Sequence, residues 1–354
     1  MKKSVLFAAL VFLFIASACN LTSLPGISTS IPPSSIPPTE AAPTPPSPTE
    51  VPPTVVPPTT MPNTAVPPTA VPPILPAPPI PPTTVPSAGI TYFVLTAVAD
   101  NISNNWVYID NPLTNNNPNA IVFATSNWNP GGVGGTYNNH EIGVWYDATV
   151  KKWAVYNQDR VAMPVGASFN VAIIPASTSV FVQTASAANI SSDGTFIDNP
   201  LTNNHLNVNL IVTANYNPAG SSGTYNNHPI GVWYDSSTNK WAIYNQDRTA
   251  MPVGAAFNVL ISSSSAVVYI QTVADTNVSG NWTSLDDIHT KNNPNAVILI
   301  TSNWNPTGGG GTYLNHSTGV WYNSGISKWA VYNQDLADMP LTAAFNIVVL
   351  GSYR

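Results

Sequence analysis

Charged side chains are scarce in this sequence: they make up 7% of its 354 residues, and the formal net charge is −6. No basic residue occurs between Lys3 and Lys151. Nucleic-acid binding needs clustered Lys or Arg to neutralise phosphates. The composition therefore argues against nucleic acid as a partner.

Cysteine is almost absent, because Cys19 is the only one in the chain. An intrachain disulfide is thus excluded, and the folded part must depend on packing alone. The helical period of apolar residues is also missing after residue 88, so helices are not expected there.

The first 18 residues are predicted to be an export signal. Lys2 and Lys3 precede an apolar run that ends at Ile15, and small residues lead to Cys19. The segment is too short and wrongly flanked for an ordinary transmembrane span. It resembles the signal peptides of bacterial lipoproteins, in which the cysteine after the lipobox receives diacylglycerol. The resemblance implies export and attachment through Cys19 to the cell membrane or envelope surface; a plain secretory signal cleaved near Ala18 is the alternative.

Residues 19–88 form a segment rich in Pro, Thr and Ser, with runs such as "PPTEAAPTPPSPTEVPPTVVPPTTMP". Proline fixes φ and removes a backbone donor, so neither helix nor sheet is available to this segment. We expect an extended, disordered stalk that would reach roughly 200 Å if fully stretched. Its predicted role is that of a tether.

The rest of the chain is a tandem array. "NWNPGGVGGTYNNHEIGVWYD" begins at Asn127, and closely similar stretches begin at Asn215 and Asn303, which is a constant interval of 88 residues. The register is unbroken, which predicts three repeats at 89–175, 176–263 and 264–354.

Each repeat is predicted to be all-β. Short runs of Val, Ile, Phe, Tyr and Trp alternate with clusters of Asn, Gly and Pro. In the first repeat these runs lie at residues 92–97, 106–110, 120–125, 143–146, 153–157 and 168–173. We expect three small β-sandwich or partly open barrel domains, each with its own core, joined by short linkers like beads on a string. A closed three-fold assembly is the alternative.

Alternation within strands predicts which faces are buried. In the last strand, Phe169, Val171 and Ile173 and their counterparts should face the core. In the third strand, the aliphatic positions beginning at Val122, Leu210 and Ile298 should also face the core. The position before each of them is occupied by Ile121, Asn209 and Val297. Because this position varies in character, we expect it to face solvent.

Two aromatic positions in the repeated stretch receive different interpretations. Trp145, Trp233 and Trp321 alternate with Val and Tyr inside a strand and are predicted to be packing residues. Trp128, Tyr216 and Trp304 lie at the edge of a glycine-rich loop, where exposed aromatic platforms could contact a ligand. The loop lacks the GK[ST] signature, so no nucleotide or phosphate is expected there.

Two further sets of polar residues are candidate ligand contacts. The first contains one histidine per repeat: His140, His228 and His316. The second contains the amides and carboxylate of the "YNQD" motif: Asn157, Gln158, Asp159, Asn245, Gln246, Asp247, Asn333, Gln334 and Asp335. A hydrogen-bonded structural histidine and a set of turn-forming residues are the competing interpretations. A lone histidine offers no metal-ligand spacing; calcium near Asp110 is a minority hypothesis, and no cofactor is predicted.

Paired carboxylates such as Asp110 and Asp159 raise the hypothesis of a glycosidase. Nothing in their spacing brings them together, and a small repeat offers no deep substrate cleft. Repeated weak sites increase avidity, whereas a repeated active site gains only in proportion to its number. We therefore predict no catalytic residues.

The signature NWNP, NHxIGVWY, WxVYNQD and MPxGAxFNV resembles a domain of unknown function that is found in secreted and surface proteins of bacteria. In the first repeat the matching residues are Trp128, His140, Trp145, Trp153, Tyr156, Asn157, Gln158, Asp159 and Phe169. The resemblance covers all three repeats but implies no activity. The function is instead predicted from the aromatic, amide and carboxylate candidates named above, which suit a sugar. They predict a surface-anchored, multivalent binding or adhesion protein that recognises carbohydrate. The alternatives are a structural or protein-binding surface module and, remotely, a hydrolase.

The lipid anchor can be tested by replacing its attachment residue. Cys19→Ser should abolish acylation and release or mislocalise the protein, because the chain has no other thiol. Metabolic labelling with palmitate and fractionation of cells would measure both effects. Label that persists in the variant would contradict the assignment.

Overall fold

The computed structural model describes residues 89–263 and 267–353. The signal sequence, Cys19 and the stalk lie outside the described residues. Within them, no helix is long and apolar enough to cross a membrane.

The described part of the chain is all-β, as predicted. The strands of the first repeat are β1 (Thr91–Thr96), β2 (Ile102–Ser103), β3 (Trp106–Tyr108), β4 (Val122–Asn127), β5 (Ile142–Asp147), β6 (Lys152–Asn157) and β7 (Ser168–Ile173). The strands of the second are β8 (Val180–Thr184), β9 (Ile190–Ser191), β10 (Gly194–Phe196), β11 (Val208–Asn215), β12 (Ile230–Asp235), β13 (Lys240–Asn245) and β14 (Ala256–Ser263). Those of the third are β15 (Val268–Thr272), β16 (Val278–Ser279), β17 (Trp282–Ser284), β18 (Ala296–Asn303), β19 (Thr318–Asn323), β20 (Lys328–Asn333) and β21 (Ala344–Ser352). All six strands predicted in the first repeat are present, and the two-residue β2 is additional. Short 3₁₀ turns, η1 (Pro130–Gly132) and η2 (Pro218–Gly220), follow β4 and β11.

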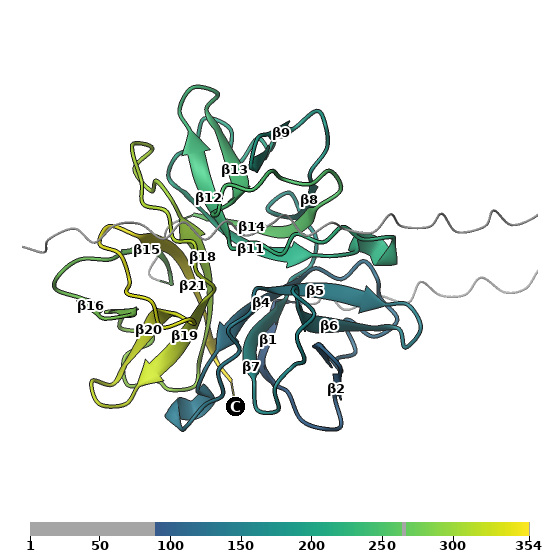
Figure 1. Cartoon of the computed structure of the whole chain (residues 1–354), viewed down its shortest axis with the longest axis vertical. Helices are drawn as coiled ribbons and strands as arrows, with labels where there is room; N and C mark the ends of the chain where they lie inside the picture. The colour runs from purple at the N-terminus through teal and green to yellow at the C-terminus, as the bar shows by residue number, and fades with distance from the viewer. Residues whose placement is uncertain (1–88, 264–266, 354) are drawn as a thin grey trace, which may run out of the picture. The chain divides into compact units, whose positions relative to one another are not determined.

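Each of the three seven-stranded sheets is shared by two repeats. The sheet orders are β1-β7-β4-β19-β20-β17-β16, β2-β3-β6-β5-β11-β14-β8 and β15-β21-β18-β12-β13-β10-β9. At each boundary a short parallel pairing joins the repeats: β5 with β11, β12 with β18, and β19 with β4. The last of these joins the third repeat to the first, so the repeats close into a ring around a common centre (Figure 1).

The expected arrangement as beads on a string is therefore wrong, because sheets run across every boundary. The expectation that each repeat has its own core is confirmed. Three separate clusters of buried apolar residues each lie within one repeat, between its three-stranded and four-stranded sheet portions. In the first repeat this cluster includes the fully buried Trp153, Phe169 and Val171. The predicted inward face of the last strand is thus correct.

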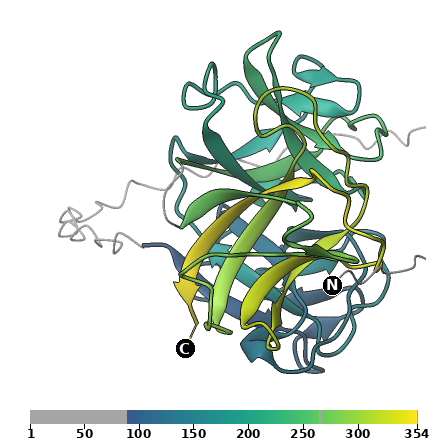
Figure 2. The ribbon, with the colours of Figure 1, turned by 90° about the vertical axis from the view of Figure 1, so that its left-hand side faces the viewer.

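A fourth apolar cluster lies where the three repeats meet. It contains Ile121, Phe123, Ala172, Ile174, Val180, Ile211, Leu260, Val268, Leu299 and Val348. Figure 2 shows β18 and the long β21 running side by side in the sheet that the second and third repeats share. The prediction that the variable position of the third strand faces solvent is wrong: Ile121, Asn209 and Val297 are 5%, 1% and 0% exposed. This strand has a repeat core on one face and the shared centre on the other, so neither face meets solvent.

The second asparagine of each "N-x-N" motif joins neighbouring repeats. The side chain of Asn217 accepts a hydrogen bond from the Tyr146 N–H at 2.7 Å and donates one to the Tyr146 carbonyl at 2.8 Å. Asn305 binds Tyr234 in the same way, and Asn129 binds Tyr322. Each amide thus imitates the edge of a strand and satisfies both backbone groups of one residue in the next repeat. We call these three pairs the amide clamps.

The glycine-rich loop is fitted to the same boundary. Gly132 has φ of +74°, and a Cβ atom there would lie 2.9 Å from the Tyr322 ring. Glycine is required because the backbone is left-handed and packs directly on the tyrosine of the neighbouring repeat.

A second set of buried amides links the repeats nearer the centre. Asn127 donates to the side-chain oxygen of Asn170 at 2.8 Å, and Asn170 donates to the carbonyl of Ile298 in the third repeat at 2.9 Å. Around the centre, Thr125, Thr213 and Thr301 each accept a hydrogen bond from a backbone N–H of another repeat. Buried polar residues of the third and last strands are therefore used between repeats.

The amide clamps should contribute measurably to stability. Asn217→Ala should lower the free energy of unfolding by about 2–3 kcal/mol, because it leaves two buried groups of Tyr146 without partners. Urea denaturation of the full chain would measure the loss. Asn139→Ala, at an exposed position, is the control and should change stability by less than about 0.5 kcal/mol. Equal effects of the two substitutions would show that the clamps do not stabilise the ring.

Candidate functional site

Aromatic side chains gather at each boundary between repeats, and at two boundaries they line a groove. Groove I, between the first and second repeats, is lined by Asn105, Trp106, Trp145, Tyr156, Tyr216 and Tyr225 and encloses about 220 Å³. Groove III, between the third and first repeats, is lined by Asn281, Trp282, Trp321, Tyr332, Trp128 and Tyr137 and encloses about 240 Å³. These are matching positions, so the ring creates the same aromatic site twice.

Strand alternation places the walls of groove I. In β5, Val144 and Tyr146 are buried in the repeat core, so Trp145 between them points to the opposite side of the sheet. There its ring meets Trp106 of β3 edge-to-face, with centroids 5.2 Å apart. The prediction that Trp145 and its counterparts are buried packing residues is corrected: they are half-buried walls of the boundary grooves. The fully buried tryptophans are Trp153, Trp241 and Trp329.

The neighbouring repeat supplies the other wall. In groove I, the rings of Tyr216 and Tyr225 lie 4.6 Å apart. In groove III, Trp128 meets Trp321 of the third repeat at 6.2 Å and Tyr137 at 5.5 Å. Because both repeats contribute, neither groove would exist in an isolated repeat.

The predicted aromatic platforms belong to these grooves, although they are not flat and exposed. Trp128, Tyr216 and Trp304 are half-buried and make ring contacts across the boundary. Their position at the edge of the glycine-rich loop was predicted correctly. Their ring contacts with the adjacent repeat were not predicted. Whether they contact a ligand stays a prediction.

The corresponding boundary of the second and third repeats, which we call groove II, has a changed wall. Trp233, Trp304, Tyr244 and Tyr313 are present, and Trp233 and Trp304 meet at 6.3 Å. Gly194 stands where grooves I and III have Trp106 and Trp282, and Asp193 stands where they have Asn105 and Asn281. One tryptophan wall is therefore missing from groove II, where Trp233 meets the Phe196 ring instead, with centroids 6.1 Å apart.

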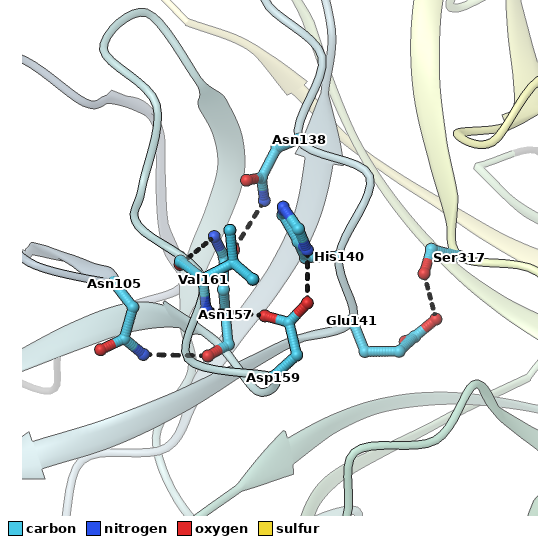
Figure 3. A network of polar contacts seen from close by, with 8 residues as sticks. All are labelled: Asn105, Asn138, His140, Glu141, Asn157, Asp159, Val161 and Ser317. Carbon is cyan, nitrogen blue, oxygen red and sulfur yellow. Dashed lines mark hydrogen bonds and ion pairs between the residues drawn. The ribbon is translucent and has the colours of Figure 1, made fainter.

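The histidines and the amides and carboxylates of the "YNQD" motif form a polar network beside the grooves. In the first repeat, Asn105 of groove I donates a hydrogen bond to the Asn157 carbonyl of this network (Figure 3). Nδ1 of His140 lies 2.5 Å from Oδ2 of Asp159, whose other oxygen accepts a hydrogen bond from the Val161 N–H. Asn157 is fully buried; it accepts from Asn138 and donates to the Val161 carbonyl. These contacts stabilise the turn after β6, which agrees with the expected hydrogen-bonded histidine.

The network is repeated in the other copies, where His228 pairs with Asp247 and His316 with Asp335 at 2.6 Å. None of these histidines, amides and carboxylates lines groove I or groove III, whereas Tyr156 and Tyr332 of the same motif do. The glutamines are also committed to protein contacts: Gln158 donates to the Ile142 carbonyl, and Gln246 accepts from the Leu314 N–H.

A smaller pocket of about 70 Å³ lies among the three repeats. Glu141 lines it and accepts a hydrogen bond of 2.6 Å from the Ser317 hydroxyl of the third repeat, as Figure 3 shows. Although some of its surface remains exposed, protein atoms surround the carboxyl. Burial raises the pKa of Glu141 from 4.5 to about 7, and the charges of Asp159 and Asp247 add to this effect.

The remaining acidic candidates have structural partners. Asp110 pairs with Lys152 at 3.0 Å and accepts a hydrogen bond from Asn115. The next residue, Asn111, forms the Asx turn by accepting from the Leu113 N–H. Across residues 89–263 and 267–353, no three His, Cys, Asp or Glu side chains are grouped as metal ligands.

Comparison with known proteins identifies the repeats. A family model described as "Domain of unknown function (DUF7452)" matches the chain at residues 83–173, 146–238 and 231–349. Comparisons with curated proteins and with solved structures found no match.

The raised pKa of Glu141 predicts that stability depends on pH. The folded state binds the carboxyl proton of Glu141 more tightly than the unfolded state does, so the protonated carboxyl favours folding at low pH. As pH rises from about 4.5 to 7, this contribution is lost. Urea denaturation from pH 5 to pH 8 should therefore show wild-type stability falling relative to that of Glu141→Gln. Neighbouring groups such as Asp159 and His316 remain in both proteins, so parallel pH profiles would contradict the prediction.

Proposed function

Because the chain belongs to this family of domains of unknown function, we propose its function from the grooves themselves: it is a binding protein that recognises carbohydrate at grooves I and III. The observation that carries the proposal is the pairing of tryptophan and tyrosine walls with an asparagine amide in both grooves.

The wall chemistry suits a sugar ring. A sugar presents C–H groups on its faces and hydroxyls around its edge, and aromatic faces pack against the former. In groove III, Asn281 donates to the Asn333 carbonyl at 3.1 Å, and its side-chain oxygen has no partner among the described residues. This amide supplies polar capacity for hydroxyls beside apolar walls, which is the combination typical of small-ligand sites.

The volumes of grooves I and III favour the binding of one monosaccharide unit in each groove. Both grooves are smaller than the roughly 300–1,000 Å³ typical of pockets for drug-sized ligands. Binding at each groove is thus expected to be weak, and the three repeats hold the two sites in one compact unit. Two sites that engage the same glycan-bearing surface raise the overall affinity through effective concentration.

The lipid anchor and the stalk complete the proposal. Lipidation at Cys19 would attach the exported protein to the membrane or envelope surface, and residues 20–88 would hold the ring away from it. The protein would then act as a surface-anchored, multivalent binding or adhesion molecule.

Glycoside hydrolysis has less support. The linings of grooves I and III contain no Asp or Glu, whereas glycosidases require two carboxylates beside the scissile bond. We therefore propose binding without catalysis.

Matched substitutions test the role of the grooves. Trp145→Ala together with Trp321→Ala removes one wall of grooves I and III, and Trp233→Ala removes the matching wall of groove II. On a glycan array probed with full-length protein, the double variant should lose at least tenfold in binding, while Trp233→Ala should retain it. Circular dichroism should show all variants folded.

Unchanged glycan binding by the folded double variant would refute carbohydrate recognition at the grooves. If the wild-type protein bound no glycan, the protein-binding or structural alternative would be favoured.

A further inference from the structure

The three boundary grooves differ in charge. The turns after β6, β13 and β20 carry Arg160, Arg248 and Leu336 at matching positions, and the two arginines lie against aromatic rings of grooves I and II. All three residues have nearly the same backbone conformation, with φ of 66°, 66° and 65°. The turns also differ at the next two positions, where the three copies carry Val161, Thr249 and Ala337, then Ala162, Ala250 and Asp338.

Arg160 lies over a wall of groove I. Its guanidinium carbon is 4.3 Å from the centre of the Tyr225 ring, which is a cation–π contact. A guanidinium stacked in this way keeps the N–H donors along its edge available for a planar acceptor. In the described part of the chain, Arg160 has no carboxylate partner within ion-pair distance.

We propose that groove I binds sugars that carry a carboxylate, which Arg160 holds, whereas groove III binds neutral sugars. The inference rests on the proposed carbohydrate binding and adds a ligand class to each groove. An arginine binds a carboxylate with two parallel hydrogen bonds, which adds specificity as well as affinity.

The electrostatics of the tyrosines agree with this distinction. Burial raises the pKa of Tyr156 in groove I, and among the nearby charges only that of Arg160 lowers it. Burial also raises the pKa of Tyr332 in groove III, where Tyr137 is the only other group that affects it. Arg160 therefore acts on the buried tyrosine of groove I, whereas no cation among the described residues affects the pKa of Tyr332.

Groove II provides a natural contrast. Arg248 lies 5.4 Å from the centre of the Tyr313 ring, so a cation is present. However, Asp193 replaces the groove asparagine and its charge acts on Tyr244, while Gly194 removes the tryptophan wall. The negative charge opposes a carboxylate, and the missing wall reduces stacking, so groove II should not bind acidic sugars.

The test uses an array of oligosaccharides of glucuronic and galacturonic acid, each printed beside its carboxyl-reduced, neutral form. The full-length protein is applied as wild type, Arg160→Leu, Leu336→Arg and Arg248→Leu. The first substitution installs the residue that the third repeat carries naturally, and the second makes the reverse exchange. The common backbone conformation allows both exchanges without a change in the turn.

Wild-type protein should bind both acidic and neutral members of the array. Arg160→Leu should reduce binding to acidic sugars at least tenfold and leave binding to neutral sugars unchanged. Leu336→Arg should increase acidic binding, whereas Arg248→Leu should have no effect. Raising the salt concentration should weaken acidic binding alone, because screening acts on the charged pair.

Four results would overturn the inference. Acidic binding that survives Arg160→Leu would show that the guanidinium does not select the ligand. An equal loss for acidic and neutral sugars would give Arg160 only a structural role at Tyr225. Binding of neutral sugars alone by the wild type would refute the ligand class but leave the proposed function intact, whereas no binding to any sugar would refute both.

Discussion

An asparagine amide that completes a neighbour's strand holds the ring together at each boundary. Asn129, Asn217 and Asn305 each satisfy the N–H and carbonyl of a tyrosine in the adjacent repeat. The parallel backbone pairing beside each clamp is only two residues long, so these side-chain bonds extend a short junction. The repeated stretch contains both halves of the contact, because the "NWNP" asparagine and the "GVWY" tyrosine occur in every copy. Each copy provides an amide on one side and receives another on the other side, so every boundary of the ring carries one clamp.

Because the ring closes, each repeat has a second buried face in addition to its own core. Each repeat buries its own apolar cluster, as an independent β-sandwich would, and the third and last strands also bury a second face at the common centre. Polar groups in that region are satisfied by other repeats, as Asn170 and Thr213 show. A repeat separated from its neighbours would expose this second face and leave its amides without partners. The four clusters and the clamps therefore form one cooperative structure.

Local sequence patterns were sufficient to predict the fold within a repeat. Alternation located the strands and the inward face of Phe169 and Val171, because both depend on neighbours a few residues away. Closure could not be predicted, since tandem repeats have the same periodicity in a string and in a ring. The errors at Ile121 and Trp145 have this origin: the first lies at the shared centre, and the second faces a groove that requires another repeat. Trp128 was recognised as a candidate from its place at the loop edge. Its contact with Trp321 was not predicted, because Trp321 is 193 residues away in the sequence.

The positions that differ among the copies show where the ring permits variation. Each clamp asparagine is bonded to the backbone of another repeat, so a change in one copy would weaken two copies. A groove residue such as Trp106, Gly194 or Trp282 has no comparable backbone contact to preserve, and it varies between tryptophan and glycine while the flanking strands keep their register. The charge at the rim varies in the same way, from Arg160 to Leu336, on an unchanged turn. The clamp contacts and the strand register keep the three copies alike, but they do not constrain the groove residues. One scaffold can therefore present sites of unequal chemistry.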